Sequence, residues 1–144
     1  MQVFGPIMVR PYLAQLITEV ATKFAKEYGL ELESWYHDQP IWILWKRFDW
    51  LVRRVQVAVY DTSEGRQIRF IPDACVLREQ RFFSTIPQAP HVFLELYGIT
   101  DFGHLPFTFE PYKTEFLAQA YSKLREAWSM ASTIQSEDCT QSLQ

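Results

Sequence analysis

Cysteine and histidine are scarce in this sequence, and the motifs of several large enzyme classes are missing. The two cysteines, Cys75 and Cys139, lie in a strand-like segment and in a polar tail, so no disulfide framework is expected. Two free thiols favour a reducing compartment. The chain has no CxxC pair, GxSxG motif, P-loop or GxGxxG motif. It therefore carries no signature of a zinc site, a serine nucleophile or a nucleotide site.

Targeting signals and long apolar runs are missing as well. The N-terminus lacks the basic start, the unbroken apolar stretch and the small-residue cleavage site of a signal peptide. No run approaches the about 20 apolar residues that span a bilayer. We therefore expect a cytoplasmic protein without a membrane partner.

The chain also lacks an excess of positive charge. Its net charge is −3, although eight of its 14 basic residues lie between positions 41 and 81. A strongly basic face is typical of nucleic-acid-binding domains, so nucleic acid is not the expected partner. Single-stranded nucleic-acid binding stays open as an alternative, because aromatic and basic residues interleave between Trp42 and Arg54.

What the sequence does contain is the composition of one globular domain with two amphipathic helices. The 144 residues are 48% hydrophobic and 22% charged. Apolar residues recur at helical spacing over 13–28 and 112–131, which predicts a helix in each segment. Pro11 suits the first turn of one helix, and Gly29 suits its left-handed end. We expect a single domain over 1–131 and a disordered polar tail over 132–144.

Between the helices the apolar pattern changes to a period of two, which is typical of strands. Strands are predicted over 30–36, 41–48, 52–60 and 67–71. Pro72 is expected either to break the last of these strands or to place it at an edge, with a continuation over 74–77 after a bulge. The turn residues of DTSEG, 61–65, predict an antiparallel hairpin. Segments 79–90 and 101–111 have the composition of loops, and 91–100 fits either a strand or a short helix. The predicted fold is α+β, a two-layer sandwich whose antiparallel sheet of four or five strands is covered by the N-terminal and C-terminal helices.

One segment, QPIWILWKRFDW at 39–50, is apolar on both faces of its predicted strand. Neighbouring side chains in a strand point to opposite faces, so the helices can cover only half of these rings. Burying one large apolar side chain is worth about 1.5–3 kcal/mol, so leaving the other half in water would cost the fold much of its stability. Loops of the same chain, a second copy of the protein or a ligand could each cover the second face.

We therefore expect a non-enzymatic binding or assembly module without a cofactor. Its partner is expected to be a second copy of the chain, as a homodimer, or another protein. The candidate contact residues lie in the aromatic and arginine-bearing segment of the sheet: Trp42, Trp45, Arg47, Trp50 and Arg54.

The competing interpretation is an enzyme or small-ligand-binding domain with a pocket between the sheet and the helices. Its polar groups would be His91, Glu95, Asp101 and His104. A metal site is not expected, because His91 and Glu95 would meet on a helix but lie about 13 Å apart along a strand.

Overall fold

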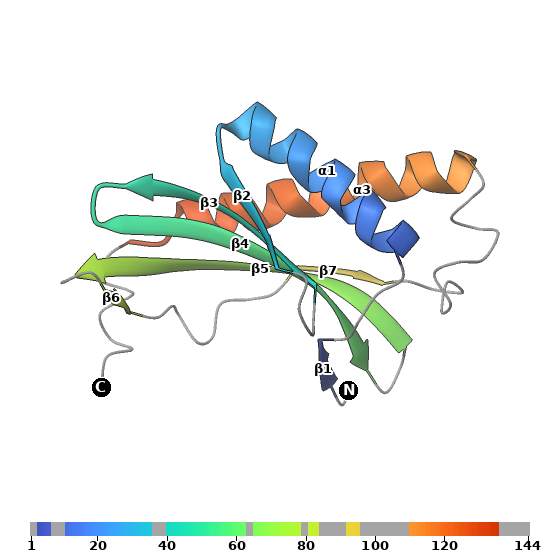
Figure 1. Cartoon of the computed structure of the whole chain (residues 1–144), viewed down its shortest axis with the longest axis horizontal. Coiled ribbons are helices and arrows are strands. Elements are labelled where there is room, and N and C mark those ends of the chain that lie inside the picture. Colours follow the sequence, from blue (N-terminus) through green and yellow to red (C-terminus); the bar gives the residue numbers. More distant parts are fainter. Residues whose placement is uncertain are drawn as a thin grey trace.

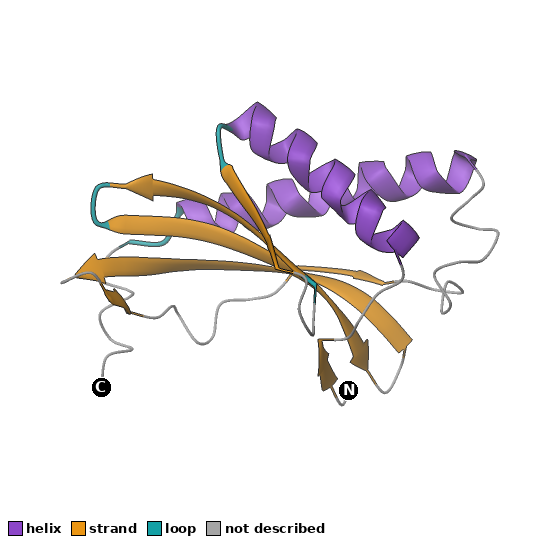
Figure 2. Cartoon of the chain, viewed as in Figure 1, coloured by secondary structure: helices purple, strands orange, loops and turns teal. Residues whose placement is uncertain are grey.

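A computed structural model of the chain describes residues 3–6, 11–35, 40–62, 65–78, 81–83, 92–95 and 110–135. The described elements, in chain order, are β1 (Val3–Pro6), α1 (Pro11–Tyr28), β2 (Glu31–Trp35), β3 (Ile41–Phe48), β4 (Leu51–Thr62), β5 (Gly65–Arg78), β6 (Arg81–Phe83), β7 (Val92–Glu95) and α3 (Glu110–Ser132). The strands form one sheet, and both helices lie on the same face of it (Figures 1 and 2). The predicted α+β, two-layer fold with a helix from each end of the chain is therefore confirmed.

Helix α1 begins and ends where its sequence predicts. Its apolar stripe, which includes Leu13, Val20 and Phe24, is buried against the sheet and α3. Gly29 has a φ of 66°, and the N–H of Leu30 donates to the carbonyl of Ala25 at 2.8 Å. This bond spans the end of the helix in the manner of a Schellman cap, which requires a left-handed residue at the position of Gly29.

Strands β4 and β5 form a long antiparallel hairpin at the centre of the sheet, as predicted. Their register runs without a shift from Leu51 opposite Val76 to Thr62 opposite Gly65. Of the two alternatives for Pro72, the strand break is wrong, because β5 passes through this residue, whereas the edge position agrees with the strand pairing. On the side of β5 away from β4, β7 pairs with residues 67–70 and β6 pairs with residues 76–78. Pro72 lies between these two segments, where no described strand pairs with β5 on that side. Proline is tolerated at such edge positions because its missing N–H removes no ladder bond.

Three short strands enlarge the sheet beyond the four or five strands expected. Strand β1 pairs with the end of β4, and β6 and β7 pair with β5, which makes a sheet of seven strands within the described residues. Strand β6 lies in the segment 79–90 that was predicted to be a loop. Strand β7 decides between the two alternatives for 91–100 in favour of a strand over 92–95. Strands of three or four residues carry too few alternations to be recognised by their period.

The C-terminal end of α3 leads into a second, smaller core. Ile134 is buried against Leu51, Ala74 and Val76, two residues beyond the end of the helix. Its carbonyl accepts a hydrogen bond from Nη2 of Arg53 at 3.0 Å. The folded domain therefore extends to at least Ile134, past the expected boundary at 131. Residues 136–144 of the expected tail lie outside the described part of the chain.

Candidate functional site

The two faces of β3 have different environments. Trp42 and Leu44 point toward the helices and are 0% exposed, and the indole Nε1 of Trp42 donates to Oγ1 of Thr18 on α1 at 2.9 Å. Ile41, Ile43 and Trp45 point to the opposite face and are half-buried. Trp42 is therefore a core residue and is not available to a partner, which corrects its inclusion among the candidate contact residues. Trp45 stays a candidate on the second face.

The middle of the second sheet face is buried within the single chain. The strand register places five residues with at most 5% exposure on this face: Val52, Ala58, Gln67, Asp73 and Cys75. No other chain is present, so atoms of the same chain bury them. This narrows the surface on which a partner can be expected, because the central part of the face is already covered.

Arg54 is held in a polar network on the same face. Its Nε and Nη2 donate to the two carboxylate oxygens of Asp73 at 2.7 and 3.0 Å, and Nε2 of Gln56 donates to Oδ2 of Asp73 at 2.7 Å. Burial lowers the pKa of Arg54, but the hydrogen bond and charge of Asp73, together with smaller effects of Cys75 and Glu33, raise it above its ordinary value. The guanidinium stays charged, and this bidentate pair mainly joins β4 to β5.

Large apolar side chains are exposed at the turn between β3 and β4. Phe48 pairs with Leu51 across this turn, which leaves Asp49 and Trp50 as its two connecting residues. Trp50 is 66% exposed and Phe48 is 39% exposed. We call the segment from Lys46 to Arg53 the hairpin end. Figure 1 shows it at one extremity of the sheet, beyond the helical layer that covers the rest of β3.

Cationic side chains lie over both exposed rings of the hairpin end. The guanidinium carbon of Arg47 is 5.9 Å from the centre of the Trp50 ring, and that of Arg53 is 4.7 Å from the Phe48 ring. Lys46 lies 5.5 Å from the same Phe48 ring. Nε of Arg47 also donates to the carbonyl of Asp49 at 2.8 Å, which fixes the guanidinium over the turn. Of the predicted contact residues, Arg47 and Trp50 are thus brought together.

The polar residues of the competing pocket are not brought together in the described structure. His91, Asp101 and His104 lie outside the described residues. Glu95 lies in β7 opposite Gln67, and the helical spacing that would pair Glu95 with His91 is replaced by a strand from Val92. The described residues also contain no group of three His, Cys, Asp or Glu side chains suited to a metal ion.

One gap between the helices and the sheet is described, and it has no room for a ligand. The small gap between them is too narrow to admit a water molecule. It is lined by apolar residues of both layers, namely Ile17, Val20, Ala21, Val57, Ile68, Phe70, Ala120 and Leu124. The expected alternative of a pocket between sheet and helices therefore gains no support from this gap and stays a prediction.

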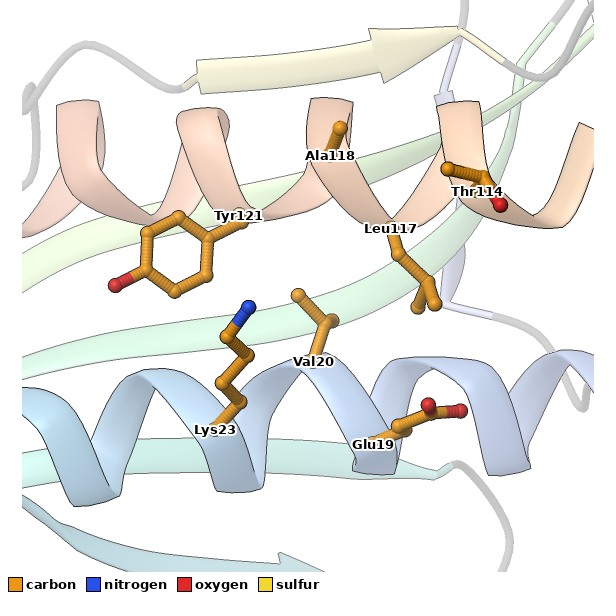
Figure 3. Close-up of a pocket in the computed structure, with 7 residues that line it drawn as sticks. All are labelled: Glu19, Val20, Lys23, Thr114, Leu117, Ala118 and Tyr121. Carbon is orange, nitrogen blue, oxygen red and sulfur yellow. The ribbon is translucent and has the colours of Figure 1, made fainter. Parts of the chain in front are cut away.

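A groove that the sequence did not indicate lies between α1 and α3. Its volume is about 470 Å³, and the described residues that line it are Glu19, Val20, Lys23, Thr114, Leu117, Ala118 and Tyr121. Figure 3 shows Val20 and Leu117 facing each other across it, with Lys23 directed toward the Tyr121 ring at 5.4 Å from the ring centre. The hydroxyl of Tyr121 donates to a carboxylate oxygen of Glu27, and this bond raises the pKa of Tyr121. The lining of the groove thus combines an apolar floor with one acidic and one basic side chain.

No known family model, curated protein or solved structure matches the chain. Within the described residues, no helix has the length and apolar character needed to span a membrane.

Proposed function

We propose that this protein is a non-enzymatic assembly module that binds a second copy of itself, and that the hairpin end makes the contact. The observation that carries the proposal is the exposure of Trp50, at 66%, at the same turn as Phe48, which is 39% exposed. Exposed apolar patches of this kind commonly mark protein contacts. The proposed contact set is Trp50, Phe48 and Arg47, with Trp45 on the adjoining part of the second face.

The residue types of the hairpin end suit a protein interface. Tryptophan and arginine are among the residues that most often dominate binding energy. Burying a large apolar side chain contributes about 1.5–3 kcal/mol, and a symmetric pair of contacts contributes this amount twice. The carbonyl of Asp49 accepts a hydrogen bond from Arg47, and its exposed carboxylate adds an acidic group to the same turn.

The hairpin end is also preorganised for binding. A two-residue connection holds Trp50, and the Arg47 guanidinium is fixed by both the ring and the Asp49 carbonyl. Side chains that are already ordered lose less conformational entropy on binding, so more of the contact energy appears as affinity.

We further propose that the protein acts in a reducing, cytoplasmic compartment. Support comes from Cys75, a buried cysteine on β5 that is 2% exposed and forms no disulfide. Proteins of oxidising compartments more often use their cysteines in disulfides.

Light scattering coupled to size-exclusion chromatography tests self-association. The wild-type protein should show a mass above the monomer value of 17.0 kDa that rises with concentration. Trp50→Ala should stay at the monomer mass, because it removes the most exposed ring of the contact. Tyr28→Ala is the matched control, since Tyr28 is also an exposed aromatic at 36% but lies on α1. A wild-type monomer at high concentration, or a Trp50→Ala mass equal to wild type, would contradict the proposal.

A further inference from the structure

The groove between α1 and α3 has the size and the apolar floor of a binding site. Ligand pockets in proteins commonly enclose about 300–1,000 Å³, and this groove offers about 470 Å³. Val20, Leu117 and Ala118 supply apolar surface, and the Tyr121 ring closes one end (Figure 3). The space suits a flat, mostly apolar group such as an aromatic ring.

The charged side chains of the groove restrict which charges a bound aromatic group can carry beside it. Glu19 and Lys23 are both exposed, lie one turn apart on α1 and both line the groove. A lone anion would meet the carboxylate of Glu19, and a lone cation would meet the ammonium of Lys23. An occupant that carries one charge of each sign beside an apolar ring fits better.

The hairpin end carries this combination. Trp50 supplies the exposed ring, Arg47 lies over it, and Asp49 is the adjoining exposed acidic residue. We infer that Trp50 of one copy enters the α1–α3 groove of a second copy, with Arg47 beside Glu19 and Asp49 beside Lys23. This inference rests on the proposed function, because it names the surface that the hairpin end contacts.

One chain cannot fill its own groove with its own hairpin end. Figure 1 shows the β3–β4 turn at the opposite end of the molecule from the first half of α3, where Thr114, Leu117 and Ala118 lie. The contact therefore joins two copies through different surfaces. Two copies that exchange hairpin ends close as a dimer, whereas one-way contacts continue into a ring or filament.

A complementation experiment tests the inference with two variants of the full chain. Trp50→Ala removes the ring, and Ala118→Arg adds a long cationic side chain at an exposed position of α3 that lines the groove. Each change should raise the dissociation constant of self-association by about thirtyfold or more. An equimolar mixture should recover a species of twice the monomer mass, because one chain keeps its groove and the other keeps its Trp50.

The matched control is Ser129→Arg, which adds the same charge at an exposed position of α3 outside the groove. It should associate as wild type does. If Ala118→Arg associates as well as Ser129→Arg, or if the mixture does not recover the larger species, the groove is not the contact surface. Loss of association in Trp50→Ala alone would then leave the proposed function standing. A wild-type chain that stays monomeric would contradict both the proposed self-association and the groove contact.

A charge reversal gives a second route that leaves the groove volume largely unchanged. Glu19→Arg should weaken association because it faces Arg47 with a like charge, and Arg47→Glu should do the same. Combining the two reversals should restore part of the lost affinity. Additive losses in the double variant would contradict the Glu19–Arg47 contact.

Discussion

Trp42 and Trp50 show how two tryptophans eight positions apart in one hairpin take opposite roles. Trp42 is 0% exposed and Trp50 is 66% exposed. Both belong to the same aromatic segment, and composition alone does not distinguish them. The difference arises because α1 covers the middle of β3 and supplies Thr18 as an acceptor for the Trp42 indole.

The Thr18–Trp42 hydrogen bond should contribute measurably to stability. Thr18→Val keeps the shape of the side chain but removes the oxygen that accepts from the buried indole N–H. We expect a loss of about 1–3 kcal/mol in the free energy of unfolding, measured by urea denaturation. Thr22→Val, at an exposed position one turn later on the same helix, should change it by less than about 0.5 kcal/mol. Equal effects of the two substitutions would show that the bond is not important.

Tyr60 should make stability depend on pH in the alkaline range. Burial raises the pKa of Tyr60, and the neighbouring Arg69, 4.7 Å from the ring centre, offsets part of this rise. The folded state thus binds the phenol proton more tightly than the unfolded state does, whose pKa is about 10. The contribution is fully present below that value and is lost as pH rises through the folded pKa.

The measurement compares wild type with Tyr60→Phe by urea denaturation at several pH values above and below about 10. The variant lacks the titrating phenol, so its stability should fall less steeply with alkaline pH. Tyr121 titrates in both proteins, so its effect cancels in the comparison. Parallel curves for the two proteins would exclude a role for Tyr60.

At the scale of elements, the hairpin end combines a strained turn with exposed rings. Asp49 has a φ of 55°, in the left-handed region that β-branched residues rarely adopt. Aspartate and asparagine tolerate this conformation better than most residues because their short side chains can bond locally. The turn that presents Trp50 therefore depends on the residue type at position 49.

Asp49→Val should destabilise the protein by about 1–2 kcal/mol, because a β-branched side chain meets the backbone at positive φ. Asp49→Asn should cost less than about 0.5 kcal/mol and serves as the control. Denaturant unfolding of both variants checks this. Equal stability of the valine variant and wild type would mean that the turn adopts another conformation.

The sequence predicts long elements with a clear apolar pattern better than it predicts features that depend on tertiary contacts. The apolar stripes of α1 and α3, the cap at Gly29 and the central hairpin all follow from local patterns. The sequence left two alternatives for Pro72 because the cost of a proline in a strand depends on whether another strand pairs beside it. The α1–α3 groove was missed because the sequence pattern assigns Glu19 and Lys23 to the polar, solvent-exposed face of α1. Only the placement of α3, about ninety residues further along the chain, makes that face part of a groove.

At the scale of the whole molecule, the proposed contact surfaces are separate from the surfaces that pack when the domain folds. The helices and the chain itself bury the centre of the sheet on both faces, as Trp42 and Cys75 show. The exposed rings of Phe48 and Trp50 lie at the turn beyond this covered region, although Leu51 and Val52 of the hairpin end are buried. The groove is lined by the first half of α3, which lies at the opposite end of the molecule from the β3–β4 turn (Figure 1). This division explains how a two-sided apolar strand can be largely sheltered in one chain and still present a contact surface.

Heteronuclear NMR of the indole N–H groups tests the central claim most directly, because the chain has five tryptophans and each gives one signal. On serial dilution, the Trp50 signal should shift as the complex dissociates, whereas the Trp42 signal should stay fixed within the core. Assignment follows from the loss of one signal in Trp50→Phe and another in Trp42→Phe. A Trp50 signal that stays constant while the mass of the protein changes with concentration would contradict the account.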